Sequence, residues 1–172
     1  MTAQHPAQGP GRGRVQVAVC GPGECTERER GHARETGRLL ARHGAVVVCG
    51  GLGGVMAAAA AGARAAGGTV VGVLPGTDRD AAGPDLTVAL PTGLGQARNN
   101  VIVNAADAVI VIGGSWGTLS ELALAMRAAV PVVQIGGWRV LDHDGRPAPG
   151  IVHAADAAEA VAATGLFGPP AR

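Results

Sequence analysis

The segment Gly113-Gly114-Ser115-Trp116-Gly117-Thr118-Leu119-Ser120-Glu121 decides the fold of this chain of 172 residues. It follows the apolar run 108–112 and precedes the helical pattern 119–129. A strand that ends at glycines and continues as a helix presents backbone N–H groups at the positive end of the helix dipole, which favours a phosphate group. The residues expected to bind phosphate here are Gly114, Ser115, Gly117 and Thr118.

Glu121 has two interpretations. It lies three residues after Thr118, so the pair fits a capping box if Thr118 caps the helix. Alternatively, a carboxylate beside a phosphate site faces another part of the ligand, since the phosphate itself repels it. That arrangement is typical of sugar recognition or chemistry next to a bound nucleotide. The sequence leaves both interpretations open.

A second glycine-rich loop follows the apolar run 45–49 and supplies four more candidate phosphate-binding residues, Gly50, Gly51, Gly53 and Gly54. Its spacing differs from the dinucleotide fingerprint, and the next strand runs into Pro75 instead of an acidic residue, which argues against a dinucleotide cofactor. Two such loops at the carboxyl ends of parallel strands favour a binding site over simple tight packing.

Val, Ile and Ala runs alternate with helical patterns along the chain, so we predict an α/β fold: a single Rossmann-like domain with a doubly wound, mainly parallel sheet. Strands are predicted at 15–20, 45–49, 69–74, 86–90, 108–112 and 132–135, and helices at 26–43, 55–66, 96–105, 118–129 and 156–163. Residues 1–13 are predicted to be a disordered leader, 14–166 the nucleotide-binding domain and 167–172 a flexible tail.

Composition excludes several functions. The net charge of +1 gives no reason to expect nucleic acid or a membrane surface as a partner. Lysine is absent from the sequence, which excludes a P-loop and pyridoxal-phosphate decarboxylation. Three cysteines without zinc spacing or a signal peptide predict a reduced, cytoplasmic protein with no metal site. We also expect no required cofactor.

Five further residues are candidates for the pocket. Arg98 is either a surface residue or a clamp for phosphate or carboxylate, a role that its planar guanidinium suits. Trp116 either packs over its loop or stacks on a ligand. The residues Gly21, Glu24 and Asn99 are expected to line the same pocket.

The motifs together resemble a known family. Gly50 to Met56, Val71 to Pro75, Arg98, Ala106-Asp107-Ala108 and Gly114-x-x-Gly117-Thr118-x-x-Glu121 are similar to the LOG (LONELY GUY) superfamily of Rossmann nucleotide-binding proteins, often mislabelled lysine decarboxylases. The nearest branch is that of the molybdenum cofactor carrier proteins. The resemblance covers residues 15–135 and identifies Arg98 and Glu121 with the family's catalytic pair.

The resemblance implies two functions. The first is a phosphoribohydrolase that cleaves the N-glycosidic bond of a nucleoside 5′-monophosphate. The second is a non-catalytic carrier of molybdopterin or a nucleotide. Asn99 replaces the family's usual basic residue, and Ser115-Trp116 stands within the family's glycine motif, so substrate identity does not carry over. The family habit also implies a homo-oligomer, a dimer or larger.

Overall fold

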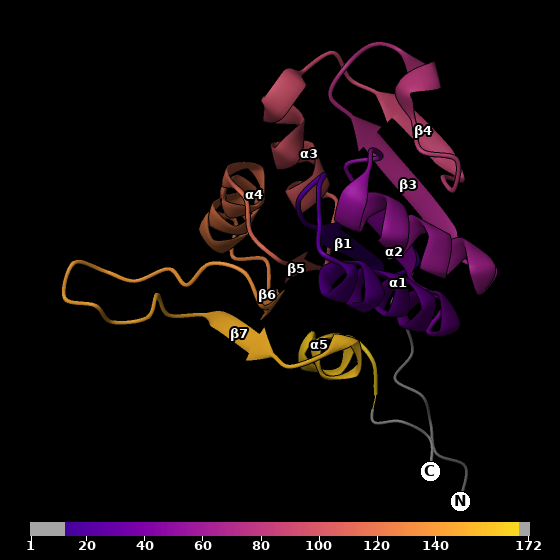
Figure 1. The fold of residues 1–172 in the computed structure, drawn as a ribbon. Coiled ribbons are helices and arrows are strands. Elements are labelled where there is room, and N and C mark those ends of the chain that lie inside the picture. Colours follow the sequence, from indigo (N-terminus) through magenta and orange to yellow (C-terminus); the bar gives the residue numbers. More distant parts are fainter. Residues whose placement is uncertain (1–12, 169–172) are drawn as a thin grey trace, which may run out of the picture.

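The computed structural model describes residues 13–168, which form one sheet covered by helices on both faces (Figure 1). The predicted leader before residue 13 and the tail after residue 168 lie outside the described residues. All seven strands pair in parallel, in the order β4-β3-β2-β1-β5-β6-β7. Their bounds are β1 (Gln16–Cys20), β2 (Val46–Cys49), β3 (Thr69–Leu74), β4 (Val88–Pro91), β5 (Ala108–Ile112), β6 (Val132–Ile135) and β7 (Ile151–Ala154). The predicted α/β class is confirmed.

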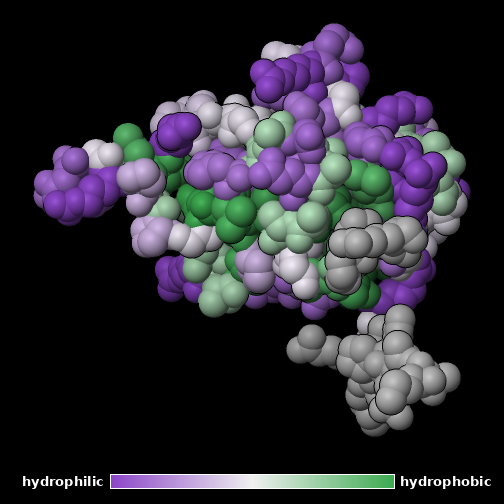
Figure 2. Space-filling view, turned by 90° about the horizontal axis from the view of Figure 1, so that it is seen from below, coloured by the Kyte–Doolittle hydropathy of each residue, from purple (hydrophilic) through white to green (hydrophobic). Residues whose placement is uncertain are grey.

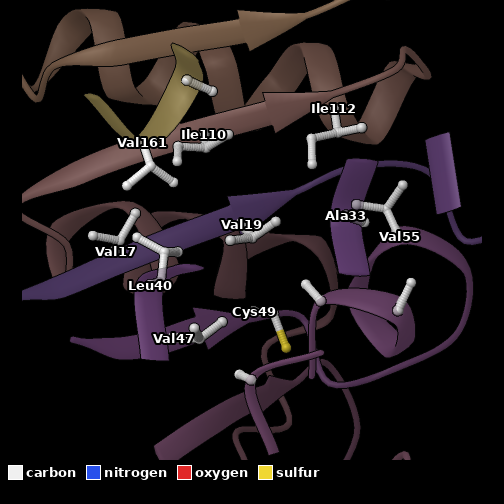
Figure 3. Packing of buried hydrophobic residues seen from close by; sticks show 14 of the residues in the cluster. Val17, Val19, Ala33, Leu40, Val47, Cys49, Val55, Ile110, Ile112 and Val161 are labelled. Atoms are coloured by element: carbon white, nitrogen blue, oxygen red, sulfur yellow. The ribbon is translucent and has the colours of Figure 1, made fainter. Parts of the chain in front are cut away.

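The helices separate into two layers. One face of the sheet packs against α1 (Glu27–Arg42), α2 (Gly54–Ala65) and α5 (Ala157–Ala163), and the other against α3 (Arg98–Asn104) and α4 (Trp116–Arg127). Figure 3 shows the first layer, where small aliphatic side chains of β1, β2 and β5 meet those of the helices. Short 3-10 turns lie at Arg79–Ala81 and Gly95–Ala97.

Glycine allows α1 and α2 to approach closely. A Cβ atom added at Gly37 would lie 2.0 Å from the carbonyl oxygen of Ala59, and one added at Gly62 would lie 1.9 Å from that of Arg34. Both distances are far below van der Waals contact, so any side chain at either position would push the helices apart. A chain with 2% aromatic residues thus builds its core through close backbone approach as well as side-chain volume.

The sheet has a topological switch point between β1 and β5. The chain proceeds from β1 outward to β4 and then returns to the other side of β1 to form β5. In open α/β sheets the connections leave in opposite directions at such a point, and ligands bind in the crevice outside the strand ends. The loops after β1 and β5 border this crevice.

Two regions differ from the sequence-based expectation. Ile151–Ala154 forms the edge strand β7, which was not predicted, because a short, half-exposed strand containing His153 lacks a long apolar run. Before it, a hairpin arm spanning 138–150 projects from the body, closed by an antiparallel bridge between Leu141 and Pro147 (Figure 1). Its tip is hydrophilic (Figure 2).

The packed body extends past the predicted domain boundary at residue 166. The ring of Phe167 stacks on His43 with centroids 4.4 Å apart and packs against the core cluster. Within residues 13–168, no helix is long and apolar enough to cross a membrane.

Candidate functional site

A cleft of about 220 Å³ opens at the switch point. It is bordered by the loop after β1, the start of α2, the segment leading into α3 and the first turn and a half of α4. The lining residues are Gly21, Gly23, Leu52, Met56, Gln96, Arg98, Asn99, Ser115, Gly117, Thr118 and Glu121. Residues from four separate segments of the sequence therefore meet at the carboxyl edge of the sheet.

The amino end of α4 faces this cleft. The helix begins at Trp116, and its N-cap is Ser115, whose hydroxyl accepts a hydrogen bond of 3.2 Å from the backbone N–H of Thr118. The N–H groups of Trp116 and Gly117 have no partner within the helix, as helix geometry requires for its first turn. They are available to an anion at the positive end of the helix dipole.

The prediction that Thr118 caps this helix is wrong. Thr118 lies one turn inside the helix, and its hydroxyl hydrogen-bonds Ser115 Oγ at 2.9 Å. Glu121 therefore lies beyond the first turn and cannot complete a capping box. The interpretation of Glu121 as a cap alone is excluded, whereas its position in the cleft agrees with the alternative.

Arg98 and Glu121 form a buried ion pair that lines the cleft. Arg98 Nη1 lies 3.6 Å from Glu121 Oε1, and the two side chains are only 9% and 8% exposed. Arg98 is thus no surface residue. Its guanidinium rests against Gly50, where an added Cβ would lie 2.7 Å from Nη2. The glycine at position 50 therefore makes room for the arginine.

Asn99 connects this arginine to α4. Its side-chain oxygen accepts a hydrogen bond from Arg98 Nη1, and its Nδ2 donates to Ser120 Oγ at 3.0 Å. Asn99 and Arg98 are both buried. Arg98 Nε is also buried and has no hydrogen-bond partner in the described structure. The neighbours of Arg98 hold its guanidinium in place, while its Nε–H group makes no hydrogen bond within the described residues.

Burial raises the pKa of Glu121 to about 7, although the charge of Arg98 and a hydrogen bond with the Cys20 thiol both lower it. The group therefore titrates near neutrality, unlike an ordinary glutamate. Burial also raises the pKa of Cys20 well above its ordinary value, and the Glu121 carboxylate raises it further. Burial likewise raises the pKa of Cys49 to about 11. These buried thiols are unsuited to nucleophilic catalysis.

The remaining predicted glycines support the loops instead of lining the cleft. A Cβ at Gly54 would lie 2.2 Å from the Pro22 carbonyl oxygen, so the α2 loop packs directly on the loop after β1. A Cβ at Gly53 would lie 3.4 Å from the Gly23 carbonyl oxygen, and Gly51 adopts a left-handed conformation with φ +74°. Of the eight predicted phosphate-binding residues, those that line the cleft are Ser115, Gly117 and Thr118.

Gly114 serves the packing of an aromatic side chain. A Cβ there would lie 2.9 Å from Trp138 Cδ1, so the glycine lets Trp138 cover the loop after β5. Trp138 in turn contacts Trp116 edge to face, with centroids 4.8 Å apart. Trp138 has no motif around it in the sequence, which is why the sequence did not reveal its part.

Two predicted lining residues lie outside the cleft. Glu24 is exposed on the loop after β1, and Trp116 is 78% exposed at the start of α4. Gly21 and Asn99 do line it. The lining residues that the sequence analysis missed are Gly23, Leu52, Met56 and Gln96. All four lie within or next to the predicted loops or shortly before Arg98. Their closeness in sequence to the predicted site residues was the one signal that could have indicated them.

Comparison with known proteins finds relatives that share the overall fold or the sequence of this chain. A molybdenum cofactor binding protein from Rippkaea orientalis is 31% identical and superposes with a TM-score of 0.79, covering 88% of this chain and 96% of that one. The molybdenum cofactor carrier protein of Chlamydomonas reinhardtii is 34% identical, with a TM-score of 0.77 and the same coverage. An uncharacterized Archaeoglobus fulgidus protein is 41% identical over 134 residues, which is 74% of this chain and 88% of that protein.

The family model of the SLOG cluster4 family matches residues 14–161. This match and the two molybdenum cofactor proteins confirm the resemblance that the motifs predicted, including its branch. By sequence match, by fold and by the arrangement of its glycine loops, the chain belongs to the SLOG cluster4 family.

Proposed function

We propose that this protein binds a phosphorylated, nucleotide-like ligand in the cleft at the switch point and holds it without converting it. One observation carries the proposal: the free N–H groups at the start of α4 and the buried Arg98 guanidinium border the same cleft. Two independent sources of positive potential at one concave site favour an anion.

The phosphate would lie at the amino end of α4, where Gly117 has no side chain to hinder its approach. Arg98 would contribute the second positive charge from α3. Because Arg98 is already held by Asn99 and by its ion pair with Glu121, its position changes little on binding. Such preorganisation reduces the entropy lost when a ligand binds.

The carrier interpretation is supported by the two structural neighbours whose names give molybdenum cofactor binding or carriage. They cover 88% of this chain at 31% and 34% identity, so the ligand that their names give is relevant to it. Molybdopterin combines a phosphate with a pterin heterocycle, as nucleotides combine a phosphate with a base. Either class of ligand presents the group that the α4 terminus would bind.

A second candidate function rests on Glu121, which lines the cleft 3.6 Å from Arg98. The protein would then hydrolyse the N-glycosidic bond of a nucleoside 5′-monophosphate. Water would attack the ribose C1′, the bond to the base nitrogen would break, and the base would leave with a proton from solvent. The products would be free base and ribose 5-phosphate. The ionised Glu121 carboxylate would stabilise the positive charge that develops on the sugar.

Two measurements test these candidates. Mass spectrometry of the protein purified under native conditions identifies what it retains, and calorimetry measures its affinity for ribose 5-phosphate and for a panel of nucleoside 5′-monophosphates. Binding without release of free base supports the carrier. Release of base that disappears in Glu121→Gln establishes the hydrolase instead. Failure to bind any phosphorylated compound or molybdopterin overturns both. Light scattering on the same sample tests the proposed homo-oligomer.

A further inference from the structure

The cleft is smaller than the pockets that usually enclose a ligand of drug size. Pockets that enclose ligands of drug size occupy roughly 300 Å³ or more, whereas this cleft measures about 220 Å³. If the phosphate lies at the amino end of α4, the sugar can fill the rest of the cleft. In this arrangement the heterocycle would extend out of the cleft.

An exposed aromatic side chain is next to the cleft in the sequence. Trp116 lies between Ser115 and Gly117, both of which line the cleft, and it is 78% exposed. A side chain on the first turn of a helix tilts toward the amino end, which is where the phosphate would bind. Large aromatic side chains are normally mostly buried, so this exposure requires an explanation.

The tryptophan is held in place without being covered. Trp138 meets it edge to face at 4.8 Å, at an interplanar angle of 77°, and Trp138 itself packs over Gly114. Gln134 Nε2 donates to the Trp138 carbonyl oxygen at 2.9 Å, which fixes the second tryptophan to the sheet. The contact between the two rings restrains Trp116, yet most of its surface remains open to solvent.

We propose that Trp116 is a stacking platform for the planar heterocycle of the ligand, restrained by its edge-to-face contact with Trp138. The inference rests on the proposed function and narrows its ligand class to phosphorylated compounds that carry a flat, conjugated ring, such as a purine or a pterin. Phosphosugars that lack a heterocyclic base would bind only through the cleft. Stacking of a base on an aromatic side chain increases affinity by about fivefold to a hundredfold.

The test compares two ligands and three proteins by calorimetry. Guanosine 5′-monophosphate carries the ring, and ribose 5-phosphate is the matched ligand without it. Wild type should bind the nucleotide at least about fivefold more tightly. Trp116→Leu should lose that advantage and keep its affinity for ribose 5-phosphate, whereas Trp116→Phe should retain most of both. Chromatography of each sample checks that the nucleotide stays intact.

Fluorescence gives an independent readout, because Trp116 and Trp138 are the only two tryptophans of the chain. In Trp138→Phe, emission comes from Trp116 alone, and the nucleotide should quench it while ribose 5-phosphate should not. Equal nucleotide affinity in wild type and Trp116→Leu, or an absence of quenching at saturation, overturns the stacking role while the proposed function stands. If wild type binds neither ligand, the stacking role for a purine is overturned. If it also binds no other phosphorylated compound and no molybdopterin, the proposed function is wrong as well.

Discussion

Glu121→Gln should make the stability of the protein against unfolding less sensitive to pH. The substitution replaces a buried carboxyl group, whose pKa is raised to about 7, by a neutral amide of nearly the same shape. In the unfolded chain the carboxyl loses its proton near its ordinary value of 4.5. Between these two values the folded state binds more protons than the unfolded state, so the stability of the wild type falls as pH rises.

The size of this effect follows from the two pKa values. At about 1.4 kcal/mol per pKa unit, the interval from 4.5 to about 7 corresponds to roughly 3 kcal/mol of unfolding free energy. Most of this loss falls between pH 5 and pH 8. The glutamine variant cannot ionise, so its stability relative to wild type should improve by about that amount over the same range.

Urea denaturation of both proteins at pH 5 and pH 8 measures the effect. The change in the difference between the two proteins cancels the other titrating groups, and the effect of the ion pair with Arg98 is already contained in the pKa of Glu121. Glu24→Gln, an exposed glutamate outside the cleft, is the matched control and should follow the wild type. A difference between Glu121→Gln and wild type that is the same at both pH values would refute the reasoning, because it would mean that Glu121 ionises as an exposed residue does.

Three further outcomes are expected from the same denaturation assay. Arg98→Met should extend the pH-dependent loss of stability above pH 7, because the arginine charge lowers the pKa of Glu121; an unchanged profile would contradict the ion pair. Gly37→Ala should destabilise by about 1–3 kcal/mol through overpacking against α2, whereas Gly31→Ala, on the same helix with open space around it, should be neutral or stabilise by up to about 1 kcal/mol. Equal effects at the two glycines would count against the close helix contact. Asp156→Ala should lower the free energy of unfolding by about 1 kcal/mol through loss of the α5 cap. An unchanged stability would contradict the capping role of Asp156.

Much of the fold was predictable because its buried strands are long apolar runs. The predicted bounds of β3, β5 and β6 agree with the structure residue for residue, and Thr26 caps α1 through a capping box with Glu29. Strands buried on both faces leave a continuous signal in the sequence, and their alternation with helices implies a parallel sheet. The edge strand β7 left no comparable signal.

The site was less predictable, since glycines of similar appearance have different physical roles. Gly117 lines the cleft, Gly50 makes room for Arg98, and Gly114 accommodates Trp138. These roles depend on contacts between distant segments, which local spacing does not encode. Thr118 was misplaced for a related reason: a Thr-x-x-Glu pattern imitates a capping box wherever it occurs, whereas the helix begins where Ser115 caps it.

The central claim is that phosphate binds at the amino end of α4, and an NMR titration of backbone amides with ribose 5-phosphate tests it most directly. The account predicts that the largest chemical-shift changes occur at the amides of Trp116 and Gly117, with a further change at the Arg98 side chain. Saturating ligand that leaves these signals in place, or that shifts amides elsewhere on the molecule, would contradict it.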